Sequence, residues 1–119
     1  MNFSGGSLKS FAKDSYLHSI YDKTVVFIGD AAKTVPRQVV DEVTERLKGI
    51  TGGDKQSFDR KFLKETTEYI QARITIAANH IPKLFDDSGA LAGRMLILPI
   101  NVSSYGREDP KLYSKLAAE

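Results

Sequence analysis

Two polar residues that could act on a phosphate group follow short apolar runs of the sequence. Residues 24–28 are β-branched or aromatic and precede Gly29 and the acid Asp30, and residues 74–78 precede the amide Asn79. A carboxylate at the end of a buried strand is how nucleotide-hydrolysing folds hold a magnesium ion, and an amide there can position water or contact a γ-phosphate. Each residue also has a simpler interpretation, because acids and amides after strands form turns and cap helices.

A third group combines two adjacent carboxylates with a nearby arginine. Asp86 and Asp87 could bind a metal or do acid–base chemistry. Carboxylates beside Ser and Gly are also typical of a helix N-terminus, and we expect Asp87 or Ser88 to cap a short helix. Arg94 directly precedes the apolar residues 95–98, which places it at the edge of a sheet. An arginine at such an edge can neutralise phosphoryl charge or form a salt bridge.

Residues 54–68 form a polar segment whose basic side chains could bind nucleic-acid phosphates. We interpret this segment as a β-hairpin or an extended projection. Phe58 and Phe62 are interleaved with the basic residues, so they could anchor the hairpin or stack on bases. A solvated charged surface would have the same composition. The basic group comprises Lys55, Arg60, Lys61 and Lys64, and between residues 55 and 64 only Asp59 is acidic.

The composition indicates one soluble globular domain and excludes several kinds of site. The chain has 119 residues, of which 41% are hydrophobic, and a net charge of +2 that is too small to indicate nucleic-acid binding by itself. Because it has no Cys, disulfides, Cys-based zinc sites and thiol nucleophiles are excluded. No apolar run is long enough for a membrane span and residues 1–6 do not resemble a signal peptide, so we expect a cytoplasmic protein with no membrane partner.

The apolar runs and the segments between them predict an α/β fold. Residues 24–28, 74–78 and 95–98 are continuously apolar, which is typical of parallel strands buried on both faces. A helix is expected between the first two runs and another near the C-terminus. Their predicted landmarks are Thr34 as N-cap, Pro36 in the first turn, Gly52 and Gly53 as the stop, and residues 111–118 as the last helix.

Three stretches match, in this order, motifs of one family. Residues 47–54 match L-K-x-I-T-G-G-D, residues 77–82 match A-T-N-x-x-P with Ala78 in place of Thr, and residues 86–99 contain D-x-S-G-A-L-x-x-R before an apolar run. From Leu8 onward the chain resembles the ATPase domain of the primase-helicases of phages, prophages and plasmids, a branch of the superfamily 3 helicases. The resemblance implies part of an AAA+-like three-layer sandwich with a mostly parallel sheet, helices on both faces and a projecting β-hairpin.

The same resemblance implies a role for each residue singled out above. Asp30 would be the Walker B acid that coordinates Mg²⁺ or the attacking water, and Asn79 the sensor that contacts the γ-phosphate. Arg94 would be the arginine finger that reaches the nucleotide of a neighbouring subunit in a homo-hexameric ring. Residues 52–65 would be the hairpin that contacts single-stranded DNA in the central channel. The match does not say which of Lys55, Arg60, Lys61 and Lys64 contact phosphate.

The chain departs from the family pattern at the phosphate-binding loop. It contains no G-x-x-x-x-G-K-[ST] motif: in the nearest sequence Leu8 precedes Lys9, and no strand is expected to lead in. Ala31 also stands where a second Walker B acid often follows Asp30. We therefore expect residues 1–119 to be the C-terminal part of a helicase ATPase domain, truncated at both ends. The parent protein would use ATP and Mg²⁺, and we expect the isolated chain to bind neither and to hydrolyse no ATP.

Two non-catalytic functions stay open at this stage. One is a module that binds single-stranded DNA through the basic hairpin, and the other is an interaction or regulatory module that associates with an intact helicase. An incomplete domain would leave a sheet edge and an apolar face uncovered. We therefore expect the isolated chain to be a monomer or a non-native dimer.

Overall fold

The computed structural model describes residues 2–29, 31, 35–58, 66–84, 86–103 and 105–118. Seven of the residues singled out in the sequence lie outside the described ranges, namely Asp30, Thr34, Asp59, Arg60, Lys61, Phe62 and Lys64.

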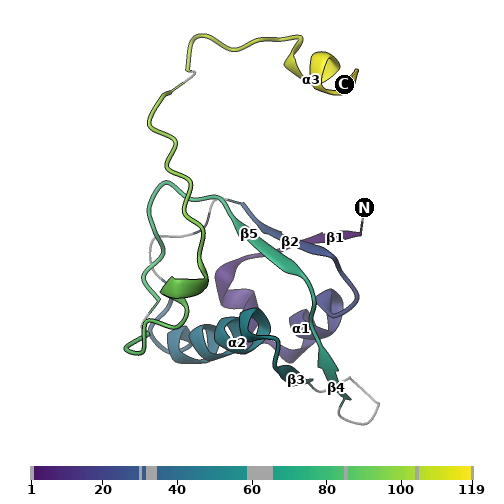
Figure 1. The fold of residues 1–119 in the computed structure, drawn as a ribbon, viewed down its shortest axis with the longest axis vertical. Helices are drawn as coiled ribbons and strands as arrows, with labels where there is room; N and C mark the ends of the chain where they lie inside the picture. Colours follow the sequence, from purple (N-terminus) through teal and green to yellow (C-terminus); the bar gives the residue numbers. More distant parts are fainter. Residues whose placement is uncertain are drawn as a thin grey trace.

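A parallel sheet of three strands forms the centre of the described structure (Figure 1). Its strands are β1 (Phe3–Gly5), β2 (Val25–Ile28) and β5 (Arg73–Ile76), in that spatial order, and both neighbouring pairs run parallel. Helical segments connect β1 to β2, and a helix and a hairpin connect β2 to β5, because parallel strands need such crossovers. The predicted α/β fold with a mostly parallel sheet is confirmed.

Strand β1 corrects one expectation from the sequence, namely that no strand precedes Lys9. Phe3 pairs with Val25 and Gly5 with Phe27, and a 3₁₀ helix, η1 (Leu8–Ala12), follows β1. The prediction missed this strand because Phe3 is its only apolar residue, so its backbone pairing with β2, rather than an apolar pattern, fixes its conformation.

One face of the sheet is covered and the other is open. Val26 and Ile28 are completely buried in a core with η1, α1 (Asp14–Ile20) and α2 (Val40–Gly52). On the opposite face, Phe27 is 45% exposed and Phe3 is 65% exposed. The prediction of strands buried on both faces is therefore wrong for β2, because the described helices pack against one face of it. The full three-layer sandwich stays a prediction.

Helix α2 follows the predicted pattern at its end more closely than at its start. Its apolar side buries Val40, Val43, Leu47 and Ile50 in the core. Gly53 ends the helix with a φ of 79°, a left-handed conformation that favours glycine, which confirms the predicted stop. The first turn begins after Val39, later than Pro36, whose carbonyl accepts a hydrogen bond from the Val39 N–H at 3.0 Å.

The polar segment after α2 contains the predicted hairpin strands. Strand β3 (Lys55–Phe58) pairs antiparallel with β4 (Thr66–Tyr69), with Lys55 opposite Tyr69 and Phe58 opposite Thr66. Phe58 is only 2% exposed, and its ring centroid lies 6.1 Å from those of both His18 and Tyr21. Of the two roles considered for this aromatic residue, the structure supports anchoring of the hairpin.

The segment after residue 94 does not form the predicted third strand. Residues 95–98 have no regular secondary structure and pair with no described strand, and Leu96 and Leu98 are 86% and 75% exposed. A strand needs a neighbour for its backbone hydrogen bonds, and apolar composition alone does not supply one. Beyond this segment the chain extends away from the body to the short helix α3 (Leu112–Leu116), which lies within the predicted residues 111–118 (Figure 1). Among the described helices, none has the length and apolar character needed to cross a membrane.

Candidate functional site

The carboxyl ends of β2 and β5 meet at one edge of the sheet. Because the strands are adjacent and parallel, Ile28 lies opposite Ile76 at their last paired position. Two further backbone hydrogen bonds extend this pairing: the Ala77 N–H donates to the Ile28 carbonyl, and the Ala31 N–H donates to the Ala77 carbonyl, both at 2.9 Å. The residues that follow the two strands are therefore neighbours, although about 50 positions separate them in the sequence.

Asn79 is exposed two residues beyond this junction. The simpler role considered for Asn79 was to cap the turn before Pro82. Within the described ranges, however, the Asn79 side chain makes no hydrogen bond that would support this role. The amide is therefore available to a ligand at this edge. Asp30 itself lies outside the described residues, between Gly29 and Ala31 in the sequence.

The described residues do not form a metal centre by themselves. No group of three or more His, Asp or Glu side chains that could hold a metal ion occurs in the described parts of the chain. Among the described side chains that follow β2 and β5, the exposed Asn79 amide has an oxygen that makes no hydrogen bond. A Mg²⁺ ion at this edge would need ligands other than the described side chains, such as the phosphates of a nucleotide.

Arg94 lies against the last turns of α2 and does not precede a strand. One N–H of its guanidinium donates to the Lys48 carbonyl at 2.7 Å, and a Cβ added at Gly52 would lie 3.0 Å from the same nitrogen. Placing Arg94 at a sheet edge was wrong, because the apolar residues after it pair with no described strand. Arg94 as a whole is exposed, and its expected action on a neighbouring subunit stays a prediction.

Asp86 has a structural role in the loop before Arg94. Its carboxylate accepts hydrogen bonds from the Ser88 hydroxyl and from the Leu91 N–H, both at 2.6 Å, and the Lys48 ammonium lies 3.5 Å away. These contacts, the Ser88 bond foremost, lower the pKa of Asp86. Asp86 therefore satisfies one backbone N–H of this loop, and the Ser88 hydroxyl accepts a second bond from the Ala90 N–H at 3.3 Å. Turns and a 3₁₀ helix, η2 (Ala92–Arg94), replace the expected helix.

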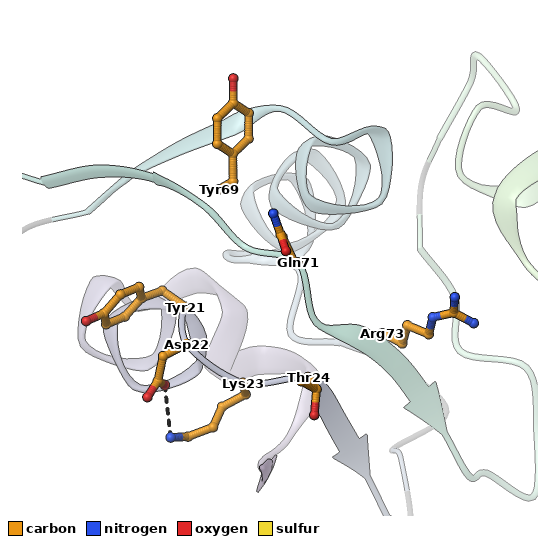
Figure 2. A pocket seen from close by; sticks show the side chains of 7 residues that line it. All are labelled: Tyr21, Asp22, Lys23, Thr24, Tyr69, Gln71 and Arg73. Atoms are coloured by element: carbon orange, nitrogen blue, oxygen red, sulfur yellow. Dashed lines mark ion pairs between the residues drawn. The ribbon is translucent and has the colours of Figure 1, made fainter. Parts of the chain in front are cut away.

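A second candidate site lies at the opposite, amino-terminal edge of the sheet (Figure 2). Here the turn before β2 and the segment that joins β4 to β5 border an open hollow of about 400 Å³. The Arg73 N–H donates to the Thr24 carbonyl at 3.0 Å and so ties the two walls together. We call this site the amino-edge hollow; its lining residues are Tyr21, Asp22, Lys23, Thr24, Tyr69, Gln71 and Arg73.

The amino-edge hollow contains both aromatic and charged side chains. Asp22 and Lys23 form an ion pair at 2.9 Å, drawn as a dashed line in Figure 2, and the hydrogen bond from Lys23 is the main cause of the lowered pKa of Asp22. Lys55, the one basic hairpin residue in the described ranges, places its ammonium 5.2 Å from the centroid of the Tyr69 ring. This hollow was missed in the sequence because its residues come from two segments about 45 positions apart and share no local motif.

Comparisons of the chain with protein-family profiles, with curated proteins and with solved structures find no match.

Proposed function

We propose that this chain is part of the ATPase domain of a DNA helicase of the phage and plasmid primase-helicase type. The observation that carries the proposal is the pairing of β2 with β5 and its extension by the Ala31–Ala77 hydrogen bond of 2.9 Å. Ligands of open α/β sheets bind where the carboxyl ends of parallel strands meet. This pairing is the arrangement that an acid after β2 and a sensor amide after β5 would need in order to face one nucleotide.

The chemistry of phosphoryl transfer fits the residue types at this edge. The protein contributes mainly positioning and charge stabilisation to such a reaction. In the proposed site Asp30 orients the attacking water or the metal that accompanies the nucleotide. The exposed amide of Asn79 contacts the terminal phosphate. When bound, Mg²⁺ would supply charge neutralisation of the phosphates.

The proposal is tested with the complete gene product, by steady-state ATP hydrolysis with and without single-stranded DNA. Asp30→Asn should lower kcat at least about 100-fold, and Asn79→Ala about 10- to 1,000-fold, the range seen when one transition-state contact is removed. His80→Gln, a change at the exposed neighbour of Asn79, is the matched control and should leave kcat unchanged. Full activity of Asp30→Asn would overturn the proposal.

A second candidate function is a non-catalytic module that binds single-stranded DNA. The observation that favours it is the hairpin, where the buried Phe58 fixes β3 and β4 to the body, and Lys55 and Tyr69 are presented together. The isolated chain should then bind an oligonucleotide with an affinity that falls as salt rises.

The basic hairpin residues provide the test of this second function. Lys61→Glu with Lys64→Glu should weaken binding, as followed by fluorescence anisotropy. Arg107→Glu with Lys111→Glu makes the same charge change on the extended C-terminal segment and should have a much smaller effect. Binding that does not depend on salt, or an equal loss in both double variants, would count against a hairpin site.

A further inference from the structure

The amino-edge hollow has the side chains needed to hold a single nucleotide unit. Two tyrosine rings line it, and both present surface to solvent, since Tyr21 is 38% exposed and Tyr69 is 51% exposed. Its volume of about 400 Å³ lies within the range of about 300–1,000 Å³ that is common for small-ligand sites. Exposed aromatic rings beside cationic groups are the usual platform for unpaired bases.

The net positive charge in and beside the hollow comes from Arg73 and Lys55. Asp22 is neutralised by Lys23 at 2.9 Å, so this pair adds little net charge. Arg73 stands at the start of β5, and within the described ranges its guanidinium makes no hydrogen bond or ion pair. Lys55 adds a second positive charge near Tyr69, on the hairpin side. A phosphate would therefore be favoured beside Arg73 or Lys55 and disfavoured beside Asp22.

A polar side chain that lines the hollow could contact the edge of a base. Gln71 lies between Tyr69 and Arg73 along the chain, and Figure 2 shows its side chain between theirs. No other described residue bonds to this amide. An amide both donates and accepts hydrogen bonds, so it suits any base and gives little discrimination between them.

We propose that the amino-edge hollow binds one nucleotide of single-stranded DNA, with the base stacked on Tyr69 and a phosphate held by Arg73. The inference rests on the single-stranded DNA binding considered above and adds to it a base-contacting site at the root of the hairpin. Because β4 ends at Tyr69 and Lys55 lies over this ring, a strand that follows the hairpin reaches the hollow directly. A duplex does not fit this role, since its bases are stacked and paired and present no free face.

The test compares two oligonucleotides that differ only in their bases. A fluorescein-labelled 16-mer of deoxythymidine and an abasic 16-mer of the same phosphate spacing are titrated with the 119-residue chain at 50 mM salt. The wild-type chain should bind the thymidine oligomer more tightly. Tyr69→Ala should weaken this binding about 5- to 150-fold, the fold-change equivalent of about 1–3 kcal/mol per stacked base. It should leave the abasic oligomer unaffected.

The matched controls come from the extended C-terminal segment. Tyr105→Ala removes a ring that is 92% exposed and does not line the hollow, and it should not change the affinity for either oligomer. Arg73→Gln should weaken the binding of both oligomers to a similar extent and make the dependence of affinity on salt less steep. Arg107→Gln should affect neither. A circular dichroism melt of each variant verifies that the fold is retained.

A second readout follows the tyrosines directly. The chain has five Tyr and no Trp, so its intrinsic fluorescence comes from tyrosine alone. Stacking of a base should quench part of this fluorescence in wild type, and less in Tyr69→Ala. Any of three results would overturn the inference. They are equal affinity for the two oligomers, no effect of Tyr69→Ala on binding, and full displacement of the oligomer by an equal concentration of free thymidine monophosphate.

The outcomes separate this inference from the functions on which it builds. The double variant Lys61→Glu with Lys64→Glu could lose DNA binding while Tyr69→Ala and Arg73→Gln bind normally. This result would overturn the proposal that the hollow binds DNA and would leave the hairpin as the DNA site. Absence of any DNA binding would overturn both. Neither result changes the expectation for ATP hydrolysis, which depends on the opposite edge of the sheet and is measured separately.

Discussion

The anchor of the hairpin can be tested by comparing the same substitution at two phenylalanines. Phe58 is 2% exposed and packs beside the rings of His18 and Tyr21, whereas Phe27 on the open face of the sheet is 45% exposed. Phe58→Ala removes a buried ring and leaves a cavity, so the free energy of unfolding should fall by about 3–5 kcal/mol. For a domain whose total stability is about 5–15 kcal/mol, this is a large fraction.

Phe27→Ala is the matched control, because it removes the same atoms from a more exposed site. Only about half of this ring is withdrawn from water, so the free energy of unfolding should fall by about 1–1.5 kcal/mol, with no closed cavity. Urea unfolding at pH 7, followed by circular dichroism at 222 nm, measures both changes. If Phe58→Ala destabilises the chain no more than Phe27→Ala, the hairpin is not anchored by this contact and the reasoning is refuted.

Three further predictions concern the loops and the C-terminal segment. Gly53→Ala should lower the free energy of unfolding by about 1 kcal/mol, because φ is 79° there, although no atom would crowd the new Cβ. Gly93 is equally uncrowded and has no positive φ, so Gly93→Ala should leave the free energy of unfolding unchanged. Urea unfolding of both variants measures the difference. The pKa of Asp86 is lowered in the folded chain, so its contribution to stability is present above its unfolded pKa and is lost as pH falls through the lower folded value. Thermal melts between pH 2 and 6 should therefore depend on pH less in Asp86→Asn than in wild type. Leu96 and Ile100 are 86% and 90% exposed, so changing both to Ser should reduce self-association in light scattering without lowering the melting temperature, and unchanged association would show that another surface is responsible.

Those elements whose signal is local in the sequence were predicted correctly. The end of α2 follows from a glycine pair after an amphipathic run, and the left-handed Gly53 confirms it. The hairpin strands β3 and β4 follow from a polar segment between two elements, and β2 and β5 from β-branched runs. In each case the residues that determine the element lie within it or directly beside it.

Those features that depend on distant partners were missed. Residues 95–98 have the composition of a strand, but a strand also needs an edge to pair with, and no described strand offers one to them. Conversely, β1 has little apolar character and exists because β2 offers such an edge. The one-sided burial of β2 has the same origin, since it depends on where the helices pack and not on the strand's own sequence.

The two candidate sites also differ in whether their residues have a local signal in the sequence. Asp30 and Asn79 were singled out because each follows an apolar run, and the strands β2 and β5 that these runs form are parallel neighbours. The amino-edge hollow was not predicted, because Tyr21 and Arg73 meet only through the fold. Arg94 was assigned to a sheet edge on the strength of the apolar run after it, and that assignment failed when the run did not pair.

The most direct test of the proposed ATPase function is the DNA sequence on both sides of the coding region. The proposal predicts that the open reading frame continues upstream of Met1 through a strand and a G-x-x-x-x-G-K-[ST] loop, whose backbone and lysine would hold the phosphates that Asp30 and Asn79 are expected to face. A stop codon directly before Met1, with no such loop in frame, would contradict ATP hydrolysis and leave DNA or partner binding as the function of this chain.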